Sequence, residues 1–116
     1  MNIAIYRIHY GIDFIGKSIK SIIDDIDLFF IFYSNNPWIV QKKMIYKNQE
    51  IDFPNNPEDV EKYLFDNFSN NSKIKIINFE CQTPLNQFGI MYEIALKNIK
   101  KKPKKVLFIE PDMVFP

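Results

Sequence analysis

Two carboxylates close to the end of the chain are the residues best placed to do chemistry. Glu110 and Asp112 follow residues 106–109, a short, β-rich apolar run of the kind found in strands covered on both faces. Pro111 between them cannot donate to a ladder, so strand pairing should stop there. Mg²⁺ and Mn²⁺ prefer carboxylate oxygens, combined with phosphate oxygens from a substrate. The stretch predicts a metal-bridged nucleotide site; the alternative is a solvated strand end with two structural acids.

Other apolar runs predict the strands that must accompany this one. Residues 3–10 and 27–34 are apolar on both faces, which is typical of strands inside a parallel sheet, and residues 73–79 predict a third strand carried by Ile74, Ile76 and Ile77. Residues 44–46 predict a shorter strand, followed by a turn at residues 47–50. The first two long strands, with a helix between them, form a right-handed βαβ unit in which the strands are neighbours.

Apolar residues at helical spacing predict three helices between the long strands. Asp13 is a suitable N-cap for the first helix. The second helix begins at Asn56, with Pro57 in the first helical position. The third helix opens at Thr83, Pro84 and Asn86. The inner faces expected for these helices are Ile15, Ile19, Ile22 and Ile23; Val60, Tyr63, Leu64 and Phe68; and Phe88, Met91, Ile94, Ala95 and Ile99. This alternation predicts an α/β fold with an open, mostly parallel sheet and flanking helices.

The carboxyl ends of parallel strands share one edge of a sheet, and several polar residues should gather there. The residues expected at this edge are His9, Tyr10 and Gly11; Tyr33, Ser34 and Asn35; Glu80; and Glu110 and Asp112. Gln87 opens the third helix from the same side, and helix N-termini favour phosphate. The edge therefore predicts a nucleotide pocket, with aromatic groups for a base, amides and hydroxyls for ribose, and carboxylates for a metal.

Missing motifs exclude several other sites. The first strand is not followed by a Gly-x-Gly-x-x-Gly or a P-loop pattern, and there is no Gly-x-Ser-x-Gly elbow. A phosphoacceptor receiver domain would carry acids directly after that strand, where this chain has His9, Tyr10 and Gly11. One histidine and one cysteine, Cys81, do not make a usual zinc site.

Composition indicates one globular domain. The 116 residues are 47% apolar and 16% aromatic, the net charge is +1, and arginine is nearly absent, so we expect no nucleic-acid partner. Residues 100–105 are rich in lysine, which suits a solvated helix end better than an anionic membrane surface. The chain has no signal-peptide pattern and no membrane-spanning run, and its single cysteine fits a reducing compartment; we expect a cytoplasmic protein without a transmembrane segment.

Four stretches together carry a resemblance to a known family. They are residues 10–22, where the first strand runs into a helix; residues 27–34 with Pro37 after them; residues 86–89; and Glu110-Pro111-Asp112. With these stretches the chain resembles the N-terminal, nucleotide-binding half of GT-A-fold glycosyltransferases of the family-two-like kind. Glu110-Pro111-Asp112 stands in the place of that family's acid-x-acid motif.

The resemblance implies sugar transfer from a nucleotide-sugar donor to an acceptor, with Mn²⁺ or Mg²⁺ bridging the diphosphate. It implies Asp112 as the foremost metal ligand, with Glu110 beside it or nearer the ribose. It also implies that residues 9–11 and 33–35 face the base. The chain departs from the family pattern where Ser34-Asn35 replaces an Asp after the second strand, and in having Glu and Pro in the acid triplet.

Two other interpretations stay open: a GT-A-like module that binds without turnover, and an unrelated flavodoxin-like domain whose ligand needs no metal. In enzymes of this resemblance, the acceptor site and the base of inverting members follow the acid-x-acid strand. We therefore expect residues 1–116 to be a single domain truncated at its C-terminus. The uncovered last strand would then favour self-association.

Overall fold

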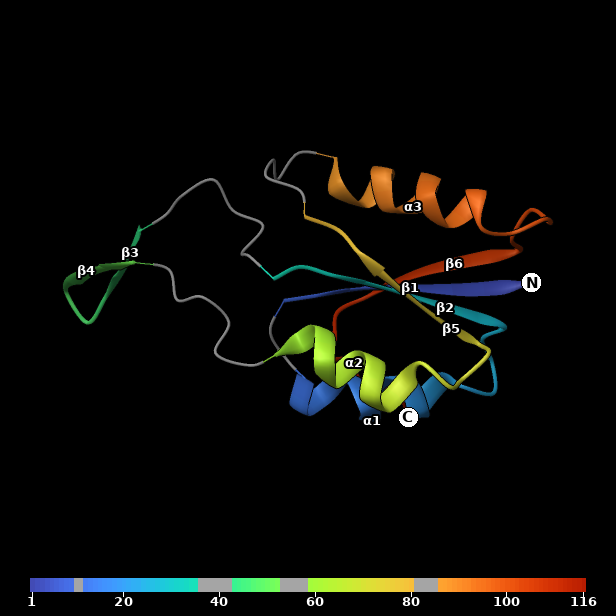
Figure 1. Cartoon of the computed structure of the whole chain (residues 1–116), viewed down its shortest axis with the longest axis horizontal. Helices are drawn as coiled ribbons and strands as arrows, with labels where there is room; N and C mark the ends of the chain where they lie inside the picture. Colours follow the sequence, from blue (N-terminus) through green and yellow to red (C-terminus); the bar gives the residue numbers. More distant parts are fainter. Residues whose placement is uncertain (10–11, 36–42, 53–58, 81–85) are drawn as a thin grey trace.

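A four-stranded parallel sheet forms the centre of the molecule (Figure 1). The computed structural model of the chain describes residues 1–9, 12–35, 43–52, 59–80 and 86–116. The strand order is β5-β2-β1-β6 and all three pairings are parallel. The strands are β1 (Asn2–Ile8), β2 (Leu28–Tyr33), β5 (Ile74–Asn78) and β6 (Lys105–Ile109). The predicted α/β fold with an open, mostly parallel sheet is confirmed.

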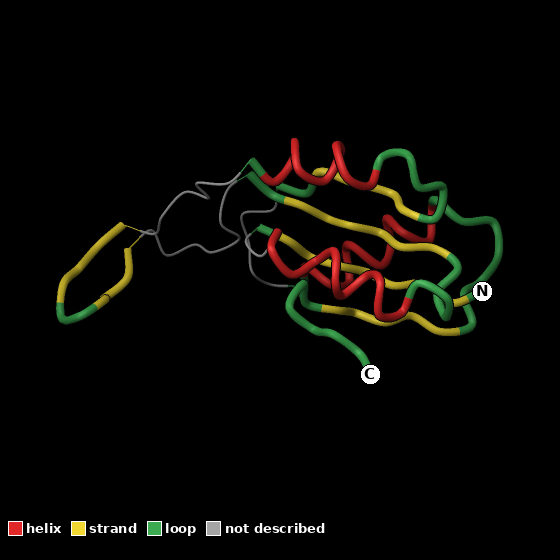
Figure 2. The backbone as a smooth tube through the Cα atoms, turned by 90° about the horizontal axis from the view of Figure 1, so that it is seen from below, coloured by secondary structure: helices red, strands yellow, loops and turns green. Residues whose placement is uncertain are grey.

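Helices cover both faces of this sheet (Figures 1 and 2). The helices α1 (Ile12–Ile22) and α2 (Val60–Phe68) lie on one face, and α3 (Gln87–Lys97) lies on the other. Because side chains alternate along a strand, β1 sends Tyr6 and Ile8 toward α1 and α2, and Ile3 and Ile5 toward α3. The two sets belong to two separate apolar cores, one on each face of the sheet.

The middle strands explain why their sequences are continuously apolar. β2 has a partner strand on each side, and Phe29, Phe30, Ile31 and Phe32 are all 0% exposed. Burial of both faces removes the polar positions that would otherwise alternate with apolar ones. The Tyr6 hydroxyl is also fully buried, and it lies 2.7 Å from the Ser18 hydroxyl of α1, so its polar end is satisfied.

β6 differs from its prediction. Among the described residues it pairs only with β1, so it is an edge strand, and Phe108 is 44% exposed. Leu107 and Val106 are partly buried against the cores on opposite faces of the sheet, so β6 is covered only in part, and its apolar run did not distinguish an edge strand from a central one. After β6 the chain crosses to α1, where the Phe115 amide donates to the Ser21 hydroxyl oxygen at 3.1 Å. Self-association through this edge stays a prediction.

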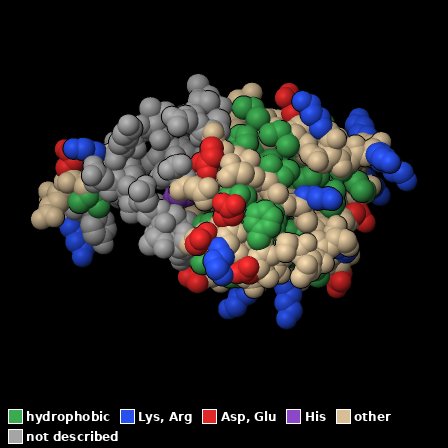
Figure 3. All heavy atoms as spheres, in the orientation of Figure 1, with side chains coloured by type: hydrophobic (Ala, Val, Ile, Leu, Met, Phe, Trp, Pro, Cys, Tyr) green, Lys and Arg blue, Asp and Glu red, His purple; other side chains and the backbone are tan. Residues whose placement is uncertain are grey.

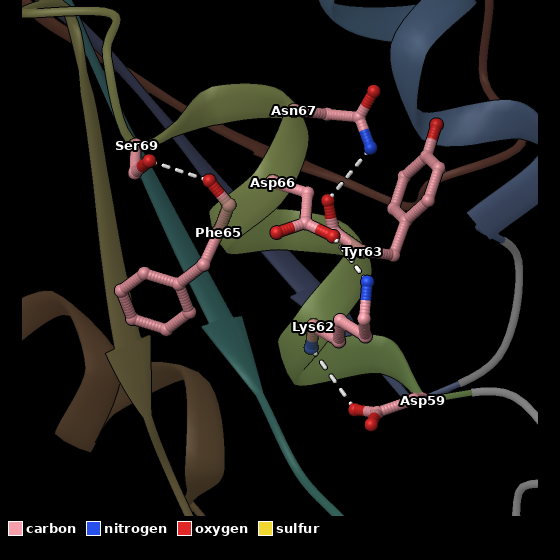
Figure 4. Close-up of polar contacts among 7 residues, drawn as sticks. All are labelled: Asp59, Lys62, Tyr63, Phe65, Asp66, Asn67 and Ser69. Atoms are coloured by element: carbon pink, nitrogen blue, oxygen red, sulfur yellow. Dashed lines mark hydrogen bonds and ion pairs between the residues drawn. The ribbon is translucent and has the colours of Figure 1, made fainter.

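The helix starts also need correction. α1 begins at Ile12, so Asp13 lies in its first turn, where a carboxylate still favours the helix dipole. α2 is capped by Asp59, whose carboxylate accepts from the Lys62 amide at 3.0 Å (Figure 4). Asn56 and Pro57 lie outside the described residues.

Within α2, Figure 4 also shows the Lys62–Asp66 ion pair, at 2.7 Å. The Asp66 carboxylate raises the pKa of Lys62 through its hydrogen bond and its charge. Both side chains are largely exposed, so the pair adds little to stability.

α3 has an unusual start. Asn86 is its N-cap residue but has a left-handed backbone (φ 61°) and makes no side-chain cap hydrogen bond. Thr83 and Pro84 lie outside the described residues. Met91 and Ala95 are buried as expected, whereas Phe88 is 40% exposed and does not belong to the buried inner face.

A β-hairpin lies beyond the carboxyl ends of the sheet strands (Figures 1 and 2). Its strands β3 (Lys43–Tyr46) and β4 (Gln49–Asp52) are antiparallel and joined by Lys47 and Asn48, both with positive φ. Two consecutive residues of this kind form the tight turn that matches strand twist. The predicted short strand is confirmed, but the predicted turn at residues 47–50 is too long, because residues 49 and 50 already belong to β4.

Burial of Tyr6 predicts a loss of stability in alkali. Desolvation raises the pKa of its phenol, and the hydrogen bond with Ser18 opposes this only in part. Above about pH 10 the unfolded chain loses this proton while the folded chain keeps it, so stability falls with rising pH by at most about 1.4 kcal/mol per pH unit.

The measurement is urea unfolding of the wild type and Tyr6→Phe between pH 8 and 11. We expect a smaller alkaline loss in Tyr6→Phe, although its stability at pH 8 is lower because Ser18 loses a partner. Equal alkaline losses in the two proteins would contradict the role of Tyr6.

Candidate functional site

The chain reverses its winding between β1 and β6. From β1 it passes through α1 on one face of the sheet, and it enters β6 from α3 on the other (Figure 1). In open parallel sheets, the crevice outside the carboxyl ends of two such strands is the usual place for a ligand. β1 and β6 are paired from Asn2↔Lys105 to Tyr6↔Ile109, so residues that follow both strands come together at this edge.

Glu110 and Asp112 lie at this edge of the sheet, directly after β6. Regular pairing ends at Ile109, and the Met113 amide donates to the Glu110 carbonyl at 3.1 Å, which closes a turn around Pro111 and Asp112. Pro111 is buried, whereas the two acids are exposed. The proline thus ends the strand as predicted and leaves both carboxylates on the surface.

Arg7 is the side chain that connects this turn to the rest of the site. It comes from β1 and its guanidinium donates to the Gln87 side-chain oxygen at 3.0 Å. It also donates to the Glu110 carboxylate at 3.4 Å, and its Cζ lies 4.7 Å from the centre of the Phe88 ring. The first strand, the start of α3 and the acid turn are therefore linked by one cation.

A second group of contacts joins the ends of β1, β2 and β5. His9 Nδ1 donates to the Ser34 carbonyl at 2.9 Å, and Ser34 Oγ donates to Glu80 Oε2 at 2.7 Å. The Asn35 amide donates to Glu80 Oε1 at 2.6 Å. The prediction that Ser34 lies near His9 is confirmed, because β1 and β2 are parallel neighbours. Glu80 holds the end of β2 in place with both carboxylate oxygens.

The predicted site residues differ in how far a ligand can reach them. Ser34 is 0%, Gln87 2%, Tyr33 4% and His9 6% exposed. Asn35, Glu110 and Asp112 are exposed. The single histidine is visible only as a small purple patch in Figure 3. Tyr10 and Gly11 lie outside the described residues.

Tyr33 belongs to the core. Its ring meets Phe65 of α2 edge-on, with centroids 6.5 Å apart. Burial raises the pKa of its phenol most strongly, a hydrogen bond from the Asn78 side chain lowers it, and the carboxylates of Glu61 and Glu80 raise it further. The ring is packed under α2 and does not offer a stacking face for a base.

The lysine-rich segment lies away from this edge. The Lys104 amide donates to the Met1 carbonyl at 2.6 Å, which places the segment at the amino ends of the strands. Figure 3 shows lysine side chains at the right-hand end of the molecule, where Figure 1 places the N-terminus. This lysine-rich segment is therefore not part of the candidate site.

A divalent cation fits the site only in part. No group of three or more His, Cys, Asp or Glu side chains comes together as a metal site in the described part of the chain. Nucleotide-bound Mg²⁺ or Mn²⁺ needs only one or two protein carboxylates besides phosphate oxygens, and the exposed Asp112 can provide one. Glu110 already faces the Arg7 cation, so it fits as a ligand only if Arg7 takes another partner.

Sequence reasoning missed Arg7 and included Glu80 only as a neighbour of the site. The signal for Arg7 was present, since it is a cation inside an otherwise apolar strand. Its partners lie 80 and 103 residues away, and no local pattern relates them. The signal for Glu80 was its position directly after the third long strand of the sequence.

The comparisons with known proteins identify no relative. No family model matches the chain, and no curated protein or solved structure matches it significantly. No helix in the described part of the chain is long and apolar enough to cross a membrane. The class of protein that the structure defines is an α/β domain with a parallel sheet.

The bonds of Glu80 predict a structural role that can be measured. In Glu80→Gln, one carboxylate oxygen becomes an amide nitrogen, which cannot accept, so a single side-chain oxygen remains for the two donors Ser34 and Asn35. Hydrogen bonds to charged groups contribute roughly 1.5–3 kcal/mol, and Glu80 is exposed, so we expect a loss of about 1–2 kcal/mol. Urea unfolding measures the loss, and hydrogen exchange of the Asn35 amide should accelerate.

The matched control is Glu93→Gln on the outer side of α3, which makes the same chemical change on an exposed residue. It should change stability by less than about 0.5 kcal/mol. Unchanged exchange at Asn35 in Glu80→Gln would show that this carboxylate does not hold the end of β2.

Proposed function

We propose that this chain is the nucleotide-binding part of a GT-A-like glycosyltransferase, which binds a nucleotide-sugar together with a divalent cation for transfer to an acceptor. One observation carries the proposal. β6 lies parallel to β1 where the winding reverses, so the acid-x-acid triplet follows β6 at the edge where open parallel sheets usually bind their ligands. An acid triplet of this kind is common by chance, and its position at that edge is what supports the proposal.

In this proposal, different exposed residues contact different parts of the ligand. Asp112, with Glu110 beside it, would hold Mn²⁺ or Mg²⁺, which supplies positive charge to a leaving diphosphate when bound. Asn35 is exposed at the end of β2, on the other side of β1, and is the polar group available there for the nucleoside. Ser34 and His9 are buried, so they shape that end of the sheet rather than contact the ligand.

A second candidate function is nucleotide or phosphate binding without a metal. The Arg7–Glu110 ion pair favours it, because a guanidinium already provides positive charge at the crevice. A domain of this kind would bind without needing Asp112.

Calorimetry with uridine and guanosine diphosphate, in Mn²⁺ and in EDTA, separates these functions. The proposal expects binding that is at least tenfold tighter with Mn²⁺. It also expects measurable release of the nucleotide when a sugar conjugate of the nucleotide that binds is incubated with candidate acceptors. Equal affinity with and without metal would support the metal-free module instead. Absence of binding under both conditions would reject both functions.

A further inference from the structure

The position of Arg7 carries a desolvation cost. It is the only arginine of the chain, and it lies in a strand whose residues Ile3, Ala4, Ile5 and Tyr6 are all 0–1% exposed. It follows Ile3 and Ile5 on the face of β1 that packs against α3, so an apolar side chain would continue the core. A guanidinium in this place has lost part of its hydration.

The ion pair with Glu110 does not offset that cost. It is a single contact of 3.4 Å, and the two side chains are 29% and 50% exposed. Pairs of this kind contribute about 0–1 kcal/mol. This ion pair therefore gives a weak reason, in terms of stability, for an arginine at position 7.

The guanidinium is held from α3 more firmly than from the acid turn. The buried Gln87 side chain accepts one of its N–H groups at 3.0 Å, and the Phe88 ring lies against it as a cation–π partner. Phe88 in turn packs edge-on against Phe108, with centroids 5.4 Å apart. Among the described residues, these two contacts of α3 orient the cation, whereas the contact with the half-exposed Glu110 carboxylate is longer, at 3.4 Å, and is the one most easily exchanged.

We infer that Arg7 is an anion-binding residue that takes the phosphate oxygens of a diphosphate at the crevice. Its planar fork matches phosphate oxygens, and Gln87 is the first residue of α3, whose positive pole adds to the attraction. On binding, Glu110 leaves Arg7 and becomes available to the cation at Asp112. The inference rests on the proposed nucleotide site and names the side chain that would recognise its anionic part.

The test uses inorganic pyrophosphate and uridine diphosphate, each measured by calorimetry in Mn²⁺ and in EDTA. Arg7→Gln should weaken pyrophosphate binding at least tenfold. Lys97→Gln removes the same charge at the far end of α3 and should change it less than twofold. Arg7→Lys, which keeps the charge but loses the fork, should give an intermediate loss and serves as the variant if Arg7→Gln does not fold.

Glu110→Gln is the most discriminating variant, because it should change pyrophosphate affinity in opposite directions in EDTA and in Mn²⁺. In EDTA it releases Arg7 from its carboxylate and should tighten pyrophosphate binding several-fold. In Mn²⁺ it removes a potential ligand and should weaken binding. Exchange of partners predicts this reversal, whereas a purely structural ion pair does not.

Two outcomes overturn the inference: equal affinities of Arg7→Gln and Lys97→Gln under both conditions, or no pyrophosphate binding by the wild type. Its failure is distinguishable from failure of the proposed function. If EDTA does not change the affinity while Arg7→Gln still weakens binding, the metal-dependent function is rejected and the anion-binding role of Arg7 is supported. If binding depends on the metal and Arg7→Gln binds like its control, only the role of Arg7 is rejected.

Discussion

Asp112→Asn is expected to remove most of the difference between nucleoside diphosphate binding in Mn²⁺ and in EDTA. Asp112 is exposed in the turn after β6, so the substitution deletes a charged oxygen without emptying any core. A hard cation loses its foremost protein ligand, and we expect the affinity in Mn²⁺ to fall about 10- to 100-fold, a change of roughly 1.4–2.8 kcal/mol. Affinity in EDTA should stay within twofold of the wild type.

The control for this prediction is Asp24→Asn. Asp24 is exposed in the turn after α1, at the amino ends of the strands, so it matches the change of charge but is distant from the crevice. Calorimetry with uridine diphosphate measures all three proteins under both conditions. An Asp112→Asn protein that keeps the full metal dependence would remove Asp112 from the site and leave the acid turn as a solvated strand end.

The architecture could be predicted because continuous apolar runs in the sequence indicate which strands are buried on both faces. β1 and β2 lie in the middle of the sheet, and strands buried on both faces have no polar positions. The helices of the βαβ units show their apolar faces at regular spacing. The parallel neighbours β1 and β2 then follow from the handedness and shortness of such connections.

Edges and caps could not be predicted in the same way. β6 has the same apolar character as β2 but has only one partner strand among the described residues, and Phe108 remains 44% exposed. The start of α2 was predicted at Asn56, which lies outside the described residues, and the carboxylate of Asp59 is the N-cap that accepts from the first turn. β4 carries charged residues and no strong apolar run, so its strand is visible only from its pairing with β3.

The candidate site was predictable in outline and not in its contacts. The edge of the sheet, the two acids and the neighbourhood of His9 and Ser34 follow from topology. Whether a side chain reaches the ligand depends on its facing direction and on partners far away in sequence. The Tyr33 ring packs against Phe65 of α2, and Glu110 pairs with Arg7, which is 103 residues away in the sequence. No local sequence pattern indicates either contact.

Phe32→Ala is expected to cause a large loss of stability. Phe32 is 0% exposed in β2, between β1 and β5, and belongs to the core under α3. Its ring meets Phe79 edge-on at 5.9 Å between centroids and stacks on Phe30 at 6.5 Å. Truncation leaves a cavity bounded by a rigid sheet, and we expect a cost of about 3–5 kcal/mol.

Urea unfolding measured by circular dichroism gives this cost as a shift of the midpoint at unchanged slope. Phe14→Ala on the exposed side of α1, where the ring is 52% exposed, is the matched control and should change stability by less than about 0.5 kcal/mol. Phe32→Leu keeps most of the volume and should lose less than about 1.5 kcal/mol. Equal losses in Phe32→Ala and Phe14→Ala would contradict the placement of β2 at the centre of the sheet. Because Ser34 follows β2 directly, a folded Phe32→Ala protein should also show faster amide exchange at Ser34, whose amide donates to the Ile8 carbonyl at 3.1 Å.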